Sequence, residues 1–144
     1  MKTYIAVGVI ALGTTAFAHS GVKDPDVMNR MMGMSEMAKQ MKVLGAMAKG
    51  EQAFDAAAVD AALVRMAEEA SYIPSLFEPK ATDPKSEALP VIWNEFDTFE
   101  EHARALEKAS TALSGTVGTR ADLGPAMKEL GQACSACHSD YRQK

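Results

Sequence analysis

Residues 121–144 read ADLGPAMKELGQACSACHSDYRQK. Apolar and cysteine side chains recur in this stretch every three or four residues, at Leu123, Met127, Leu130, Cys134, Cys137 and Tyr141. This spacing places them on one face of an α-helix. We therefore predict a helix that begins near Ala121 and reaches almost to the C-terminus, with both cysteines on its buried face.

A helix is also predicted over residues 25–49. It follows Asp24-Pro25, an N-cap residue with proline at the first helical position, and Gly50 ends it. The side chains expected to face inward are small residues and methionines, namely Val27, Met31, Met34, Ala38, Met41 and Gly45.

The middle of the chain predicts two more helices. Residues 56–72 follow the N-cap residue Asp55 and are expected to end before Pro74, which has no N–H to donate. Residues 74–89 hold three prolines among polar residues, which is typical of a long surface crossover. Residues 90–113 begin at a proline and are followed by glycines, so they predict the remaining helix.

No stretch of the chain after residue 18 alternates apolar and polar residues in the way a strand does. The fold is therefore expected to be all-α. Four amphipathic helices of these lengths predict an antiparallel four-helix bundle.

Residues 1–18 differ in character from the rest. Lys2 gives a positive end, residues 5–12 are an apolar run, and Ala16-Phe17-Ala18 has the small-x-small pattern of a cleavage site. The run is too short to cross a bilayer. We predict a cleavable signal peptide over residues 1–18, a single domain over residues 19–144, and a mature protein located in the periplasm.

The net charge of the full chain is −4, and loss of Lys2 with the signal peptide makes the mature protein one unit more negative. An acidic chain is a poor match for nucleic acid. No later apolar segment predicts membrane insertion.

Cys134, Cys137 and His138 stand at positions i, i+3 and i+4 of the last predicted helix, so they share one face. Two thiols one turn apart can form thioethers with the two vinyl groups of a haem that lies against the helix. The adjacent imidazole can then bind the iron. The motif predicts one covalently attached haem c.

Other uses of this cysteine spacing fit the sequence less well. A thiol-disulfide oxidoreductase places Cys-x-x-Cys at a helix N-terminus, where the dipole lowers the thiol pKa, whereas this motif lies near a helix C-terminus. A structural zinc site needs four ligands, and only His19 and His102 remain as nitrogen donors. A structural disulfide here would close a very small loop and constrain the unfolded chain little.

The sequence resembles the class II c-type cytochromes, the cytochrome c′ family, whose haem motif lies near the end of a four-helix bundle. The resemblance spans essentially residues 19–144 and is carried by residues 43–50, Phe54-Asp55, residues 57–59, Ile92-Trp93 and residues 134–142. It implies that Cys134 and Cys137 form the thioethers, that His138 is the proximal iron ligand and that Arg142 lies beside it.

The resemblance also identifies the residue at the other face of the iron. It lies four residues after an arginine on the first helix, and this pair is Arg30 and Met34 here. Residues four apart share a helix face, so Met34 can offer its thioether to iron while Arg30 binds a haem propionate. The alternative is that Met34 is a core residue among neighbouring methionines, in a helix where Gly33 stands in place of the larger apolar residue common in the methionine-ligated branch.

Several other residues are expected near the haem. The resemblance implies that Trp93 contacts the haem edge, and Tyr141 is expected beneath its proximal side. Arg142 is expected to bind a propionate or to stabilise the helix C-terminus as a cation. His102 lies off the apolar stripe and is expected to be solvated. The haem-lining set predicted from the sequence is Arg30, Met31, Trp93, Phe96, Tyr141 and Arg142.

Two functions follow from the two readings of Met34. With His138 and Met34 as ligands, the protein is a low-spin carrier of single electrons, exchanging them with other exported or membrane-bound redox proteins. With no sixth ligand it is a high-spin cytochrome c′ that binds nitric oxide or carbon monoxide; storage or sensing without a redox partner is a third possibility. No constellation of residues indicates substrate turnover. The resemblance implies either a homodimer that pairs through the first two helices or a monomer, as in part of the methionine-ligated branch.

Overall fold

The structure, a computed structural model, describes residues 21–144, so the predicted signal peptide and His19 lie outside the described residues. Four α-helices form this part of the chain: α1 Pro25–Lys49, α2 Ala56–Phe77, α3 Phe96–Leu113 and α4 Leu123–Tyr141. Two 3-10 turns, η1 Pro90–Trp93 and η2 Arg120–Asp122, precede α3 and α4. The predicted all-α four-helix fold is confirmed.

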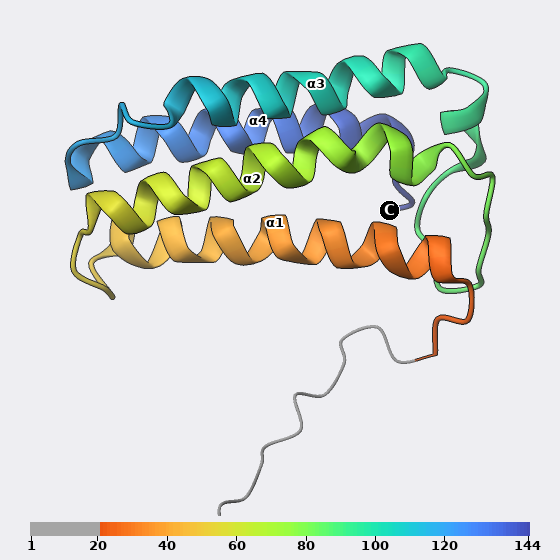
Figure 1. Cartoon of the computed structure of the whole chain (residues 1–144), viewed down its shortest axis with the longest axis horizontal. Helices are drawn as coiled ribbons and strands as arrows, with labels where there is room; N and C mark the ends of the chain where they lie inside the picture. Colours follow the sequence, from red (N-terminus) through yellow and green to blue (C-terminus); the bar gives the residue numbers. More distant parts are fainter. Residues whose placement is uncertain (1–20) are drawn as a thin grey trace, which may run out of the picture.

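The helices lie side by side, and consecutive helices are antiparallel (Figure 1). α2 packs against α1 and α3, α3 packs against α4, and α1 makes sparser contact with α4. The start of α1, the α2–α3 crossover and the end of α4 all lie at one end of the bundle (Figure 1). We call this the crossover end.

The core runs the length of the bundle and contains fully buried side chains from all four helices and from η1. The largest are Leu44, Met47, Leu63, Met66, Ile92, Phe99, Leu123 and Leu130. Each contributes roughly 1.5–3 kcal/mol through burial of apolar surface. Within residues 21–144, no helix combines the length and apolar character that a bilayer crossing requires.

The ends of α1 follow the sequence prediction. The Asp24 carboxylate accepts hydrogen bonds from the backbone N–H groups of Asp26 at 2.9 Å and Val27 at 3.1 Å, which satisfies two donors of the first turn. Gly50 ends the helix with φ of 76°, a left-handed conformation that glycine adopts without a Cβ clash.

The predicted end of the second helix is wrong, because α2 continues through Pro74 to Phe77. Proline removes one donor from the helix, but Ile73, Pro74 and Phe77 are all buried. Phe77 lies 4.8 Å from Phe99 between ring centroids. Burial of this last turn offsets the missing backbone hydrogen bond, and packing overrides the local signal of the proline.

The third helix is also shorter than predicted. Residues 90–93 form the separate turn η1, and α3 begins only at Phe96. The indole N–H of Trp93 donates to the backbone carbonyl of Phe77 at 2.7 Å, which ties η1 to the end of α2. This tether turns the chain before α3 starts. The last helix, predicted from near Ala121, likewise begins with the turn η2 and becomes α-helical at Leu123.

The predicted inward stripe of α1 is partly wrong. Ala38 is exposed and the three methionines of the stripe are only half-buried. The buried residues of α1 are Val27, Arg30, Gly33, Met37, Leu44, Gly45 and Met47. A Cβ on Gly33 would meet Leu76 of α2 at 3.6 Å, while a Cβ on Gly45 would meet Met127 of α4 at 3.5 Å. Because α1 has two contact faces, a single stripe does not describe it.

Candidate haem site

The Cys-x-x-Cys-His motif lies in the last turns of α4, which continues through it to Tyr141. Cys134, Cys137 and His138 are half-buried. Both cysteines are free thiols that pack against the hydrophobic core. Two partly exposed thiols one turn apart, with an imidazole beside them, have the arrangement that covalent haem attachment requires.

The protonation chemistry of the motif differs from that of a redox-active Cys-x-x-Cys. Burial raises the pKa of Cys134, and burial together with Cys134 and Asp140 raises the pKa of Cys137 to about 11. A catalytic thiol of an oxidoreductase needs the opposite shift. Burial and the Arg142 cation lower the pKa of His138, which favours the neutral imidazole that binds metals. Within residues 21–144, no three His, Cys, Asp or Glu side chains converge as a metal-binding group.

The register between α1 and α4 follows from one contact. The Cε atom of Met127 lies 3.5 Å from the position that a Cβ on Gly45 would occupy, so these two residues face each other. Met34 is eleven residues before Gly45, and His138 is eleven residues after Met127. Because the helices are antiparallel and rise equally per residue, Met34 and His138 lie at the same level.

The helical phase agrees with this register. Eleven residues at about 100° each return to within about 20° of the starting direction. Met34 therefore points from α1 in nearly the direction of Gly45, toward α4. His138 points from α4 in nearly the direction of Met127, toward α1. Register and phase together thus predict that the thioether of Met34 and the imidazole of His138 face the same space between α1 and α4.

The burial of these two helices changes along their length. At the crossover end, the residues of the predicted site are half-buried: Met31, Met34, Cys134, Cys137 and His138. In the other half of the same helices, Leu44, Met47, Leu123 and Leu130 have 0% exposure. The side chains of the candidate site are therefore more exposed than these fully buried residues of the same helices. A planar group joined to α4 by thioethers would cover these side chains, so the residues present fit haem c.

Arg30 is one turn before Met34, as predicted, but its side chain is only 3% exposed. Its guanidinium donates to the backbone carbonyls of Leu76 at 2.8 Å, Ala81 at 3.0 Å and Pro79. Burial lowers the pKa of Arg30, while Asp26 and Asp24 raise it. Three protein carbonyls already satisfy the three guanidinium nitrogens, and binding of a propionate by Arg30 stays a prediction.

The Arg30 guanidinium also lies over two aromatic rings. Its central carbon is 4.6 Å from the centroid of Phe77 and 5.5 Å from that of Trp93. Trp93 is half-buried and Phe96 lies against Phe99, with ring centroids 5.9 Å apart. The structure thus brings Arg30 and Trp93 together, whereas Phe96 is part of the core aromatic cluster around Phe99.

Tyr141 is buried behind the motif, with 4% exposure, and its ring meets Phe99 edge to face at 5.4 Å. Its hydroxyl donates to the Glu95 carboxylate at 3.2 Å. The prediction that His102 is solvated is only partly right: its side chain is half-buried and its ring lies 5.9 Å from that of Tyr141. The helical phase of His102 predicted its position off the apolar stripe of α3. It did not predict that His102 faces Tyr141 of α4.

Arg142 lies one turn after His138, at an exposed position, and pairs with Glu87 of the crossover. Its Nε and Nη2 lie 2.6 Å and 2.5 Å from the same Glu87 oxygen. Sequence reasoning did not predict this ion pair, because an acidic residue in a polar loop has no periodicity to mark it. The same holds for Glu95, which holds the Tyr141 hydroxyl.

Comparison with known proteins assigns the fold and motif to a family. A family model described as cytochrome C′ matches residues 26–142. The chain belongs to the cytochrome c′ family. Cytochrome c-556 of Rhodopseudomonas palustris is 33% identical to it over 150 residues, covering 100% of this chain and 98% of that protein. Cytochrome c-556 of Agrobacterium tumefaciens (strain apple 185) is 44% identical over 103 residues, covering 70% of this chain and 81% of that protein.

A solved structure agrees with the bundle as a whole. The structure of oxidised R. palustris cytochrome c556 aligns with a TM-score of 0.77 at 35% identity, covering 85% of this chain and 98% of that one. The family resemblance drawn from the sequence is confirmed. As a cytochrome c′ family member, the protein carries haem c, joined by two thioethers, and its two cysteines suffice for that linkage.

Proposed function

We propose that this cytochrome c′ family member is an electron carrier rather than an enzyme, and that His138 and Met34 are the two axial ligands of its iron. The contact between Gly45 and Met127 supports the proposal most directly, because the register it implies puts Met34 and His138 at the same level of antiparallel helices. The cytochrome c-556 relatives support the assignment at the level of the whole chain.

When bound, haem c supplies a one-electron ferric/ferrous couple. The residues of the chain set its environment. Cys134 and Cys137 would fix the group to α4, His138 would bind the iron as a neutral imidazole, and the thioether of Met34 would favour the ferrous state and so raise the potential. Helices packed on a continuous core hold the same ligands in both oxidation states, which keeps the rearrangement during electron transfer small.

We further propose that the protein works in the periplasm and exchanges electrons with other exported or membrane-bound redox proteins. The predicted signal peptide supports the location, and the net charge of −4 over the full chain supports encounters with complementary basic surfaces. Such encounters bury little area and are brief.

Homodimer formation through the first two helices stays a prediction. Large apolar side chains are exposed on these helices, Met32 on α1 and Val64 and Tyr72 on α2, with 58%, 48% and 52% exposure. A second copy that covered them would bury this apolar surface.

The visible spectrum of the purified holoprotein, oxidised and reduced, with and without carbon monoxide, tests the ligand assignment. Sharp ferrous bands that do not change with carbon monoxide are expected for an iron with two protein ligands. Broad high-spin bands that shift on addition of the gas would overturn Met34 ligation and support the gas-binding alternative.

A further inference from the structure

The crossover between α2 and η1, residues 78–89, makes contacts with both ends of the described chain. We call these residues the strap. The Asp83 carboxylate accepts hydrogen bonds from the backbone N–H groups of Lys23 at 2.8 Å and Asp24 at 3.2 Å. Asp24 is the N-cap residue of α1. The strap therefore holds the first turn of α1 through one of its acidic side chains.

A second attachment to α1 lies closer to the candidate ligand. Arg30 donates to the carbonyls of Pro79 and Ala81 within the strap and to that of Leu76 just before it. Arg30 is four residues before Met34, which is about 6 Å along the helix. The hydrogen bonds between the strap and α1 thus reach to within one helical turn of Met34.

The far end of the strap is attached to α4 in the same manner. Ala88 and Arg142 form an antiparallel bridge, the N–H of Leu89 donates to the carbonyl of Tyr141 at 2.9 Å, and that of Gln143 donates to the carbonyl of Glu87 at 2.7 Å. The Glu87 carboxylate also pairs with the Arg142 side chain. Arg142 is four residues after His138, so these contacts also reach to within one turn of a candidate ligand.

The strap thus joins the two neighbouring helices whose mutual contact is sparsest. α1 packs mainly on α2 and α4 mainly on α3, and the direct contact between α1 and α4 is sparse. At the crossover end, the candidate site residues of both helices are half-buried, so apolar burial stabilises this part of the seam less than the fully buried part. The distance between the two helices at the level of Met34 and His138 depends on what bridges them.

We propose that the strap is a positioning element for the sixth ligand: by holding Arg30 of α1 and Arg142 of α4, it fixes the spacing of the two ligand-bearing helices and keeps Met34 at the iron. Asp83 and Glu87 are its positioning residues. This inference rests on the proposed axial ligation by Met34. When the strap is loosened, Met34 leaves the sixth position more often, and an external ligand gains access to it in proportion.

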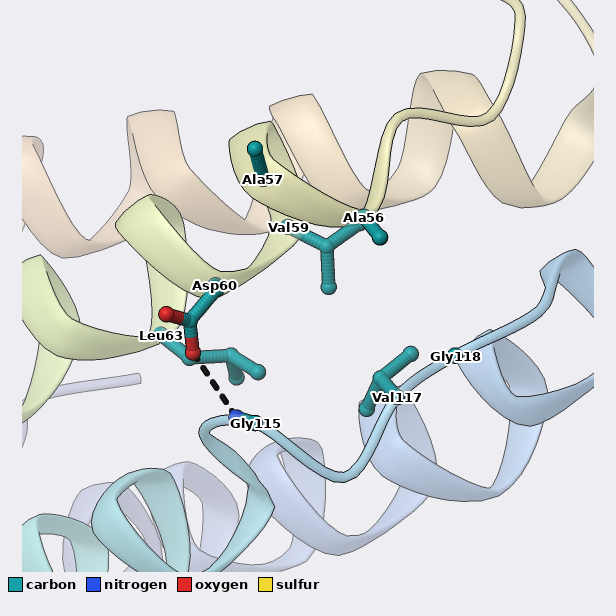
Figure 2. A pocket seen from close by; sticks show the side chains of 8 residues that line it. All are labelled: Ala56, Ala57, Val59, Asp60, Leu63, Gly115, Val117 and Gly118. Carbon is teal, nitrogen blue, oxygen red and sulfur yellow. Dashed lines mark hydrogen bonds between the residues drawn. The ribbon is translucent and has the colours of Figure 1, made fainter.

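The experiment compares two variants of the holoprotein. Asp83→Ala/Glu87→Ala removes the two strap side chains, while the backbone bridge to Arg142 stays. Asp60→Ala is the matched control, because Asp60 ties a loop to a helix at the opposite end of the bundle. Its carboxylate accepts from Ser114 Oγ at 2.5 Å. It also accepts from the Gly115 N–H at 2.8 Å (Figure 2). Both variants lose polar tethers of exposed loops, but only the first acts on the seam between α1 and α4.

Two measurements are made on each: the rate of carbon monoxide binding to the ferrous protein, and the far-red band of the ferric protein that reports a methionine–iron bond. We expect the strap variant to bind carbon monoxide about tenfold faster than wild type and to lose part of this band, because the open population rises by that factor. Asp60→Ala is expected to match wild type in both.

The results separate the role of the strap from the ligation of iron by Met34. Equal rates and equal bands in the two variants, with a six-coordinate wild type, would overturn the role of the strap and leave Met34 ligation standing. A wild type that already binds carbon monoxide rapidly and lacks the band would instead overturn the proposed function. Should the double variant fold poorly, Asp83→Asn and Glu87→Gln are measured singly in the same way, and each is expected to increase the rate.

Discussion

Gly45 of α1 faces Met127 of α4, whose Cε atom lies 3.5 Å from the position that a Cβ on Gly45 would occupy. This approach needs a small residue on α1, because the methionine methyl group fills the space where a larger side chain would project. The pair sets both the distance and the register of the two helices in the tightly packed half of their seam. It therefore fixes which residues face each other at the crossover end.

Substitution of Gly45 should depend on side-chain size. Gly45→Ala brings its Cβ into ordinary van der Waals contact and removes a glycine from a helix interior, so the free energy of unfolding should rise by up to about 1 kcal/mol. Gly45→Leu overfills the space and should lower it by about 1–3 kcal/mol. Denaturant unfolding of the holoproteins measures both changes. Equal stability of the two variants would show that α1 and α4 are not held by this contact.

Replacing the candidate ligand should change the iron and little else. Met34→Leu keeps a similar volume, so the fold should persist, while loss of the thioether should convert low-spin iron to high-spin and open the ferrous protein to carbon monoxide. Met41→Leu is the matched control, because Met41 is half-buried on the same helix and lies outside the predicted haem-lining set. Its spectrum should equal that of wild type. A high-spin spectrum in this control would move the ligand to Met41.

The sequence was sufficient for the helices that carry strong end signals. As predicted, α1 begins after Asp24 at Pro25 and ends at Gly50, because a side-chain cap and a left-handed glycine act locally. Pro74 was misleading because its local cost is offset by the burial of Ile73 and Phe77 against other helices. That packing involves residues distant in sequence, and no window of the chain contains it.

The candidate site also has a part that the local sequence predicts and a part that depends on packing between helices. Cys134, Cys137 and His138 lie within one helix, so their spacing alone predicted their shared face. The pairing of Met34 with His138 stays a prediction, and its support from the register between α1 and α4 needed the contact between Gly45 and Met127, which no window of the sequence contains. The pairs formed by Glu87 and Asp83 lie in a loop without periodicity, and sequence reasoning missed them.

Removal of the two thiols should distinguish covalent attachment of haem from non-covalent haem binding. In a Cys134→Ala/Cys137→Ala variant, denaturation and extraction with acidified organic solvent should release all haem, whereas wild type should retain it on the chain. Each single variant should keep one thioether. Mass spectrometry of the denatured chains measures the retained haem. Retention by the double variant would show that these cysteines are not the attachment points.

The end of α1 offers a test of backbone conformation. Gly50 has φ of 76°, and a Cβ there would lie 2.7 Å from the Arg120 guanidinium, whose Nε donates to the carbonyl of Ala48 at 3.1 Å. Gly50→Ala should therefore lower the free energy of unfolding by about 1 kcal/mol or more. Gly124→Ala is the control, because a Cβ on Gly124 meets nothing within 4 Å and α4 is helical there. Thermal unfolding in which both variants lose equal stability would contradict this account.

Acid should weaken the tether between α2 and the α3–α4 loop. Hydrogen bonds from the Ser114 hydroxyl and from the Gly115 N–H, the second of which Figure 2 shows, lower the pKa of Asp60 in the folded protein. The folded-state pKa is thus below the unfolded value of about 3.9, so the stabilisation is complete above that value and is lost as pH falls through the folded pKa. Asp60→Asn replaces the carboxylate by a neutral group at every pH. Urea unfolding from pH 7 to pH 3 measures the difference in unfolding free energy between wild type and Asp60→Asn. This difference should shrink toward the acid end. A difference that stays constant would show that Asp60 does not contribute to the acid sensitivity of the fold.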